Sequence, residues 1–239
     1  MTEFDEFEQE FDFDEEEFLA EWAEAEEQAA EAVRIGIAEL DVPVPTYEEL
    51  TAAAASIRAA ARDDDYAIGW AVRAAGFEHL DELDEVDDEG LVVEVLAAPI
   101  SMVEDPEIDA EDAATVMALQ LADWVAAVLG LVRGGPGAPA DPEAVVELIA
   151  DSPDVDGELD TEDVPLLEQA FHLVLPVWRG AGIVDRDDQL TTVGAWALPR
   201  AAVLAWSEDL DLAPLSDEDE DADGDGAPVD ELAEWLPDD

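Results

Sequence analysis

Apolar residues recur at helical spacing along most of the chain. From about Asp14 they return roughly once per turn, and this period predicts an amphipathic helix. The segment from Asp41 to Pro45 then interrupts the period, because proline disfavours continuation of a helix. The residues that set the period are Phe18, Leu19, Trp22 and Ala25.

The next third of the chain predicts further helices. Thr46 followed by Glu49 is a capping box, which predicts a helix from there to about Arg62. The aspartates at 63–65 predict the start of another helix that ends near Gly76. The apolar, β-branched stretch 91–96 fits either a short strand or a buried helical turn, and its pattern does not choose between them.

A long apolar segment follows an acidic one. Asp109 and Asp112 predict the start of a helix that runs to about Arg133. Its part 113–132 has the length of a membrane span. However, Asp123 lies in the middle of that part, where a charge opposes insertion into a bilayer. We therefore expect a buried core helix rather than a membrane span.

The second half repeats the pattern of caps and apolar faces. Asp141 before Pro142 predicts a helix start, and a further helix is expected from about residue 163 to Trp178. Pro176 should kink that helix or end it early. Residues 182–185 and 189–191 then predict two short strands around a tight turn, and 194–206 predicts a helix that must accommodate Pro199.

These elements predict a mainly α fold: a helical core with a small β-wing near the C-terminus and acidic flexible ends. The expected segments are an acidic-aromatic arm (1–13), a helical domain (14–133), a linker rich in glycine and proline (134–140), a winged-helix-like helical domain (141–210) and a disordered acidic tail with a short terminal helix (211–239).

The run from Trp178 to Asp185, followed by Leu190-Thr-Thr-Val-Gly194, resembles the passage from wing to following helix in winged-helix domains. Together with the sequence 196–200 and Ala205-Trp206, it is also similar to the C-terminal part of uncharacterised helical proteins of high-GC Gram-positive bacteria. The resemblance covers about residues 165–206 and implies DNA binding. Yet the helix in the recognition position offers only Arg179 and the wing offers only Arg186, which favours a degenerate element used for packing or protein contact.

Charge changes the picture. The 239 residues include 67 acidic and 8 basic side chains, for a formal net charge of −59. All basic residues are arginine, and neither lysine nor cysteine occurs. Thiol and Schiff-base chemistry and a P-loop are therefore excluded. Direct binding to nucleic acid or to an anionic membrane is disfavoured, since both depend on Lys and Arg.

No pattern identifies catalytic residues, a metal site or a cofactor. His172 stands one turn after Glu168, but a histidine at the edge of a core, oriented by a carboxylate, explains this spacing better than a ligand pair. His79 is expected at the surface. Two acidic segments, 219–230 and 152–163, approach the spacing of a calcium loop, but both lack essential positions, and acidic tracts produce such matches by chance.

Apolar anchors among carboxylates at both ends of the chain are the strongest interaction signal. Such segments can dock in an apolar groove bordered by Lys or Arg, with charge steering the encounter. The alternative for the N-terminal part is a helix that caps the protein's own core. The candidate partner-binding residues are Phe4, Phe7, Phe11, Trp22, Leu232, Trp235 and Leu236.

Three hypotheses remain open on the sequence. The first is a non-enzymatic interaction protein whose acidic arms bind a basic protein partner, with the acidic surface imitating nucleic-acid phosphates. The second is a helical protein from a saline cytoplasm, whose acidity is adaptation to solvent; the absence of lysine favours it, and the clustering of charge opposes it. The third is an enzyme that binds Mg²⁺ through carboxylates. Because residues 1–5 show no signal peptide, we expect a cytoplasmic location.

Overall fold

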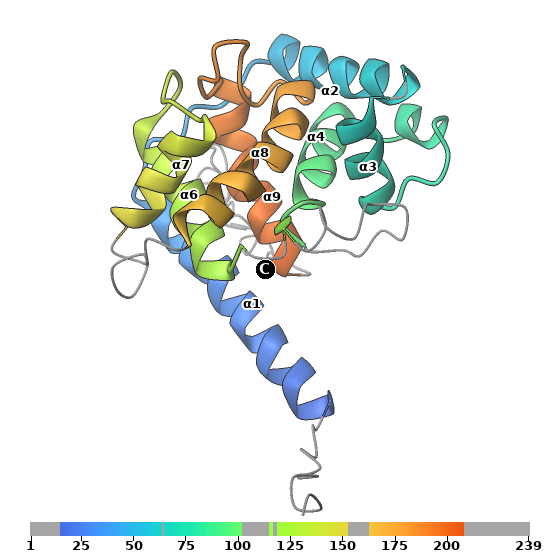
Figure 1. The fold of residues 1–239 in the computed structure, drawn as a ribbon. Coiled ribbons are helices and arrows are strands. Elements are labelled where there is room, and N and C mark those ends of the chain that lie inside the picture. The colour runs from blue at the N-terminus through green and yellow to red at the C-terminus, as the bar shows by residue number, and fades with distance from the viewer. Residues whose placement is uncertain (1–14, 64, 102–114, 117–118, 153–162, 208–239) are drawn as a thin grey trace, which may run out of the picture.

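The computed structural model describes residues 15–63, 65–101, 115–116, 119–152 and 163–207. This part of the chain is mainly helical, as the sequence predicts, with no extended strand among the elements assigned (Figure 1). The elements in chain order are α1 (Glu15–Ala38), α2 (Tyr47–Arg62), α3 (Tyr66–Ala74), the short 3-10 helix η1 (Glu82–Asp84), α4 (Asp88–Ala97), α6 (Leu121–Gly134), α7 (Pro142–Ala150), α8 (Val164–Gly180) and α9 (Thr192–Trp206).

Local capping fixes where most helices begin. The Thr46 side chain accepts from the Glu49 N–H, and the Glu49 carboxylate accepts from the Thr46 N–H at 2.7 Å, which completes the expected capping box of α2. Asp141 caps α7 by accepting from Ala144 N–H, with Pro142 at the first position. Asp65, Asp87 and Thr191 cap α3, α4 and α9 in the same way.

Two helices form the centre of the core. Helix α9 packs against α1, α4 and α6, and α4 also packs against α2 and α3. Almost every side chain between Leu91 and Ile100 is buried, with Glu94 the half-buried exception. Residues 91–96 therefore belong to a helix and not to a strand, and Asp87 caps the start of this helix. Because the helix is covered on all sides, its sequence shows no alternation of polar and apolar faces.

A second layer is formed by α6, α7 and α8, where α6 packs on α7 and α7 packs on α8. Trp124 of α6 meets Phe171 of α8 edge-on, with 5.6 Å between ring centroids. Phe171 in turn lies 5.9 Å from the ring of Trp178. These three fully or almost fully buried aromatic side chains join α6 to α8.

Both internal prolines are tolerated inside helices. Helix α8 continues through Pro176 to Gly180, so of the two outcomes expected at Pro176 an early end of the helix does not occur. Helix α9 likewise runs through Pro199. A proline removes one backbone donor and displaces one carbonyl. Buried side chains next to each proline, Val177 in α8 and Leu198 in α9, pack in the core and help to hold the helix against that loss.

The expected β-wing is not supported. In the described residues, 183–190 contain an isolated bridge between Val184 and Leu190 rather than two strands. The Asp188 N–H donates to the Asp185 carbonyl and closes a tight turn, and Thr191 is already the N-cap of α9. Too few residues therefore remain on either side of the turn to form a ladder of paired strands. Residues 134–140, expected as a linker, pair with this turn: Leu190 N–H donates to the Ala138 carbonyl at 2.8 Å.

The buried side chains on both sides of residues 134–140 belong to one hydrophobic core. Gly182 and Gly137 adopt positive φ values of 71° and 92°, which lets the chain turn into and out of this pairing. The packing therefore joins the segments 14–133 and 141–210, as far as they are described, into one body.

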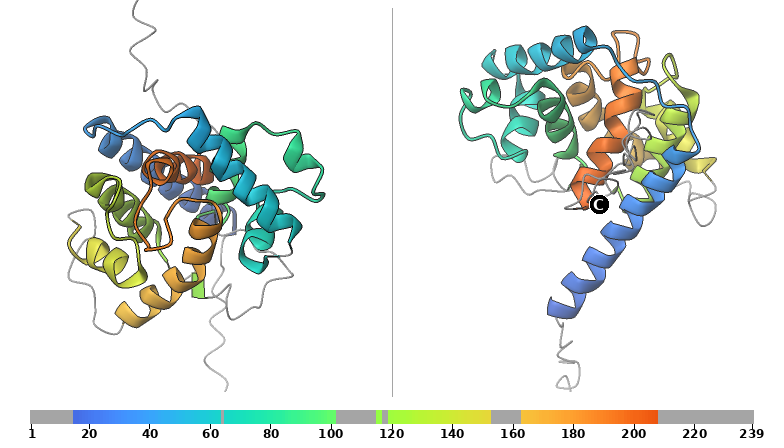
Figure 2. Two further views of the ribbon diagram at one scale, coloured as in Figure 1. Left: turned by 90° about the horizontal axis from the view of Figure 1, so that it is seen from above. Right: turned by 180° about the vertical axis from the view of Figure 1, so that it is seen from behind.

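Helix α1 has a different role at each end. Its C-terminal half lies on the body, where Ala30, Val33 and Ile37 are buried. Its N-terminal half extends away from the body as a single helix (Figure 1 and the right view of Figure 2). Among the described helices, none combines the length and apolar character that a membrane crossing requires.

Candidate interaction surfaces

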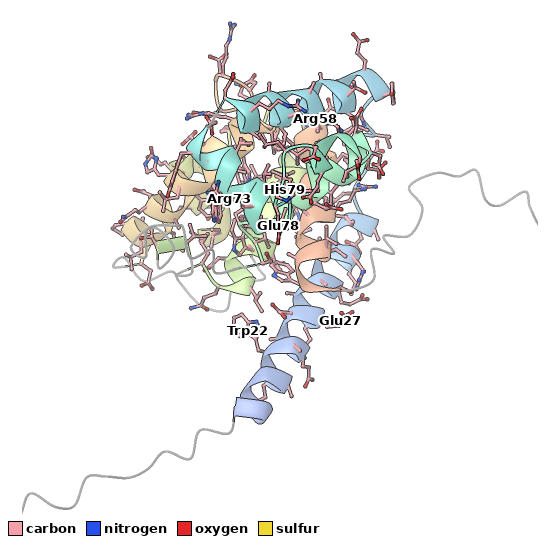
Figure 3. All side chains as sticks on the ribbon, turned by 90° about the vertical axis from the view of Figure 1, so that its right-hand side faces the viewer. Trp22, Glu27, Arg58, Arg73, Glu78 and His79 are labelled. Atoms are coloured by element: carbon pink, nitrogen blue, oxygen red, sulfur yellow. The ribbon has the colours of Figure 1, made fainter. Side chains whose placement is uncertain are left out.

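The projecting half of α1 is exposed and acidic. Residues 20–24 are all exposed, and Trp22 keeps 38% of its surface accessible (Figure 3). Trp22 stands seven positions before Ala29, so it continues the stripe that becomes buried from Ala29 onward. The other sides of this half carry exposed carboxylates, among them Glu21 and Glu24.

The first basic residue of the chain, Arg34, lies where α1 reaches the body. Its guanidinium is 3.2 Å from the Glu27 carboxylate and 3.5 Å from that of Glu31. It also donates to the Ser207 hydroxyl at 2.9 Å, which ties the end of α9 to α1. Arg34 therefore fixes two helices together and does not make the projecting half cationic.

Other arginines in the described residues are engaged as well. Arg62 donates to both oxygens of Asp84 at 2.8 Å, and Arg186 lies 3.7 Å from Asp187. Arg73 and Arg133 also have interaction partners. The described surface thus presents carboxylates in excess, with its cations held by neighbouring groups.

Arg58 fastens the acidic turn 81–88 to α2. Its guanidinium donates to the carbonyl oxygens of Leu83 at 2.9 Å and Val86 at 3.0 Å, and to the Asp88 carboxylate at 2.6 Å. The Thr51 hydroxyl donates to the second Asp88 oxygen at 2.8 Å. The hydrogen bond from Arg58, followed by that from Thr51, lowers the pKa of Asp88.

Arg200 on α9 is a half-buried cation. It stacks on the ring of Trp196 at 4.1 Å and donates to the Trp196 carbonyl oxygen at 2.9 Å. Burial lowers its pKa to about 10, while Glu89 acts in the opposite direction. This cation is consequently turned into the protein and adds nothing to a basic surface.

Two carboxylates are held in apolar surroundings. Asp123 is buried in the first turn of α6, and desolvation raises its pKa although its carboxylate accepts from Gln120 N–H at 2.8 Å. Desolvation, together with repulsion from Asp87, also raises the pKa of Glu94. Among the described residues, neither carboxylate belongs to a group of three or more His, Asp or Glu side chains that could hold a metal ion.

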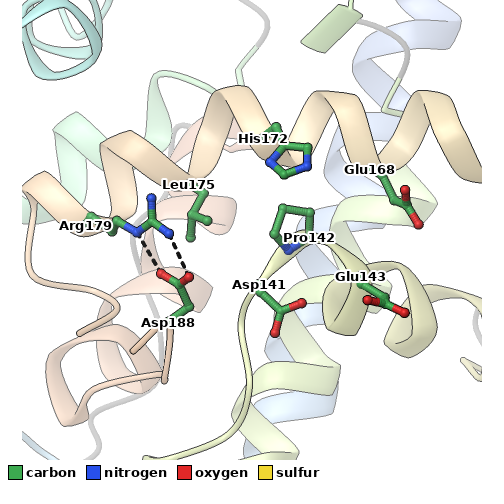
Figure 4. A pocket seen from close by; sticks show the side chains of 8 residues that line it. All are labelled: Asp141, Pro142, Glu143, Glu168, His172, Leu175, Arg179 and Asp188. Atoms are coloured by element: carbon green, nitrogen blue, oxygen red, sulfur yellow. Dashed lines mark hydrogen bonds and ion pairs between the residues drawn. The ribbon is translucent and has the colours of Figure 1, made fainter. Parts of the chain in front are cut away.

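A shallow pocket opens between the start of α7, one face of α8 and the turn before α9 (Figure 4). Its volume is about 370 Å³. Arg179 forms its wall and donates to both oxygens of Asp188 at 2.6 Å, which lowers the pKa of Asp188 and raises that of Arg179. The lining residues are Asp141, Pro142, Glu143, Glu168, His172, Leu175, Arg179 and Asp188.

The side chains that line this pocket are mainly carboxylates, with one histidine and one arginine. Its lining contains no hydroxyl or thiol nucleophile, and its only arginine is engaged by Asp188. Within the described residues, no group of three His, Asp or Glu side chains lies close enough together to hold a metal ion. His172, expected at the core edge, lies exposed on α8, and His79 is exposed as expected.

Of the candidate partner-binding residues, Trp22 is the one that the structure describes. It lies on the projecting half of α1, away from the pocket. Sequence reasoning missed the pocket and the contacts of Arg58, because both join residues that are distant in sequence. The remaining candidates, Phe4, Phe7, Phe11, Leu232, Trp235 and Leu236, lie outside the described residues, as do segment 219–230 and most of 152–163.

The fold and these surfaces define a mainly helical, strongly acidic protein with one projecting helix. Comparison of the chain with protein-family models, curated proteins and solved structures finds no match.

Proposed function

We propose that this chain is a non-enzymatic interaction protein whose acidic surface binds a basic protein partner. The observation that carries the proposal is the exposed, acidic half of α1, which leaves the body without any basic residue before Arg34. Charge complementarity of this kind accelerates encounter and selects against wrong partners. Binding of a basic partner would also offset the electrostatic self-repulsion of a chain whose net charge is −59.

Engaged arginines support a protein partner over nucleic acid. Affinity for a phosphate backbone comes from Lys and Arg side chains that can replace counterions. Here Arg58, Arg62 and Arg179 each donate to a carboxylate of the chain itself. A surface of this sign suits a basic protein, including one whose own ligand is nucleic acid, because carboxylates on helices can imitate its phosphates.

A winged-helix-like scaffold is part of the proposal. The order α6, segment 137–140, α7, α8, then 183–185 and 188–190, follows the order of elements in a winged helix. Two isolated bridges, Pro139–Gln189 and Val184–Leu190, connect these three segments in that order without forming strands. In this scheme α8 occupies the recognition position, and its Arg179 is held by Asp188. The element would therefore serve packing or protein contact instead of DNA binding.

The test is capture on the immobilised full-length chain, followed by mass spectrometry. Basic proteins from nuclease-treated lysate should bind at low salt and elute at about 0.5 M NaCl, where the Debye length falls to roughly 4 Å. Double-stranded DNA should compete if phosphates are imitated. Resin carrying poly-glutamate of equal charge density is the control, because it retains basic proteins by ion exchange alone. Recovery of the same proteins from both resins in equal amounts would contradict the proposal.

A further inference from the structure

We infer that the outer face of α2 binds a second copy of this chain, whose own α2 lies antiparallel to it across a two-fold axis at Ala55. We call the five exposed side chains of this face the α2 seam: Glu48, Ala52, Ala55, Ala59 and Arg62. The inference does not depend on the basic partner proposed above, because it concerns a different helix and a different occupant.

The α2 seam points away from the body. Helix α2 packs on α3, α4, α8 and α9 through its other face, where Ala54, Ile57 and Ala61 are buried. Figure 1 shows α2 along the upper edge of the body, and the view from behind in Figure 2 shows it in the same outer position. A second molecule can therefore reach the seam without displacing any part of α2 from its own core.

Negative charge is missing from this helix, although it dominates the chain. Acidic residues occupy 67 of 239 positions, yet none occurs between Leu50 and Arg62. The cation within that stretch, Arg58, is turned toward the turn 81–88 and bonded there. Carboxylates on outer helix positions would keep two copies apart through like-charge repulsion. Their absence makes the α2 seam a face on which two copies of this acidic chain can approach each other.

The spacing of the seam is that of a helix-pairing surface. Its members stand at positions 48, 52, 55, 59 and 62, alternately four and three residues apart, which is the period along which one helix packs on another. The three central side chains are alanine, and their small size allows the helix axes to approach to the short end of the usual range of about 8–10 Å. Alanine alone selects no partner, so the choice of occupant depends on the charged ends of the seam.

Those ends are complementary to a second copy of themselves. Glu48 and Arg62 carry opposite charges and stand seven positions on either side of Ala55. A two-fold axis at Ala55 therefore sets Glu48 of each copy beside Arg62 of the other, which is the self-complementary arrangement of a two-fold dimer. A parallel pair would set like charges against each other at both ends, and their repulsion disfavours it.

Arg62 has donors left for this contact. Its hydrogen bonds to Asp84 use Nη2 alone, so the N–H groups on Nε and Nη1 can reach a second carboxylate. The neighbour of Glu48 along the helix, Glu49, is engaged by Thr46 in the capping box, which leaves Glu48 as the exposed carboxylate at this end of the seam.

The expected dimer is weak and strengthens with salt. A helix of 16 residues is about 24 Å long, and two such helices bury less than the roughly 1,200 Å² at which stable interfaces begin. We therefore expect a dissociation constant of about 10–500 µM. Because each copy has a net charge of −59, NaCl should favour the dimer by screening repulsion, up to about 0.5 M. Capture of a basic partner has the opposite dependence on salt.

Sedimentation of the full-length chain over a range of concentrations, at low salt and at about 0.5 M NaCl, measures this equilibrium. Ala55→Glu should weaken the dimer at least tenfold, because the two-fold axis brings the two introduced carboxylates together. Ala23→Glu adds the same charge at an exposed position of α1 and should leave the dimer unchanged. Circular dichroism of both variants should match that of the parent, since glutamate is a good helix former.

Charge reversal tests the antiparallel orientation. Glu48→Arg and Arg62→Glu should each weaken the dimer about tenfold, and the two changes together should restore it, because every pair is then again of opposite sign. Glu78→Arg alters the net charge as Glu48→Arg does, but at an exposed position outside α2, and should not weaken the dimer.

Cysteine cross-linking tests the register. The chain contains no cysteine, so Ala55→Cys introduces a single thiol. With the two-fold axis at this position, oxidised glutathione should link two copies through a disulfide far faster than it links copies of Ala23→Cys, whose thiols meet only by collision.

Four results would overturn the inference. They are a chain that stays monomeric at every concentration and salt, a dimer unaffected by Ala55→Glu, a dimer unaffected by either single charge reversal, and cross-linking of Ala55→Cys no faster than that of Ala23→Cys. Protection of the Ala55→Cys thiol from alkylation in a monomeric chain would assign the seam to another segment of the same chain. Loss of captured basic proteins in the Ala55→Glu chain, with self-association intact, would assign it to the basic partner, and either outcome also overturns the inference.

Discussion

Replacing Arg58 by methionine tests whether the acidic turn is held by one guanidinium. Methionine keeps the aliphatic stem and a comparable helix propensity in α2, so the change removes chiefly the donors. In the parent chain these donors reach Leu83, Val86 and Asp88, and the Arg58 side chain is 17% exposed. The variant leaves two backbone carbonyls and one carboxylate without this partner.

The magnitude follows from those three contacts. A hydrogen bond to a charged group contributes about 1.5–3 kcal/mol when buried, and partial access of water to the released acceptors reduces the sum. We expect a loss of about 3 kcal/mol in the free energy of unfolding. For a body of this size that corresponds to a melting temperature lower by roughly 6–12 °C.

Urea denaturation followed by circular dichroism measures this loss. Arg62→Met is the matched control, because its pair with Asp84 has side chains that are 44% and 58% exposed and should contribute less than about 1 kcal/mol. The difference between parent and Arg58→Met should narrow below pH 4. The lowered pKa of Asp88 stabilises the folded parent only above its ordinary value of 3.8, and this contribution is lost as pH falls through the folded pKa. Equal losses for the two variants would refute the argument.

Three further outcomes are expected. Gly194→Ala should destabilise the chain by about 2–3 kcal/mol, because a Cβ there would overlap the Ile183 carbonyl oxygen; Gly69→Ala, with its nearest atom at 3.5 Å, should be neutral or stabilising in thermal melts. Asp123→Asn should raise the free energy of unfolding at pH 7, because burial raises the pKa of Asp123 in the folded chain and so penalises its charged form. The gain should disappear in acid, where the Asp123 carboxyl is protonated and carries no such penalty. A gain that persists at pH 3 would contradict desolvation as its cause. The urea midpoint of the full chain should rise with NaCl and level off near 0.5 M as repulsion is screened, whereas a rise that continues to several molar would favour adaptation to a saline cytoplasm.

Elements that depend on neighbouring residues could be predicted from the sequence. The capping box of Thr46 and Glu49 and the start of α7 at Asp141 are confirmed, because a cap involves residues only three positions apart. The helical character of 91–96 could not be predicted, since a segment buried on all sides has no period to distinguish a strand from a helix.

Features that depend on distant residues could not be predicted. The Arg58 contacts span α2 and the turn after α3, and the pocket at Arg179 joins α7, α8 and the turn at Asp188. The segment 134–140 has the composition of a linker, but its residues 137–140 pair with 188–190 and so form part of the folded body. Trp22 was predicted as an anchor from its spacing among acidic residues, and its exposure on a projecting helix was not visible from that spacing.

The placement of charge separates binding from solvent adaptation more sharply than its total. Adaptation to brine should place carboxylates on exposed helix faces in general, yet the outer face of α2 exposes Ala52, Ala55 and Ala59. On α1 the exposed positions are dominated by glutamate instead. Selection for solvation alone gives no reason to place alanine on the exposed face of one helix and glutamate on that of another. Binding of a cationic partner on one side of the molecule does give such a reason. The absence of lysine agrees with both explanations, so the difference between α1 and α2 is the observation that supports the proposed binding role.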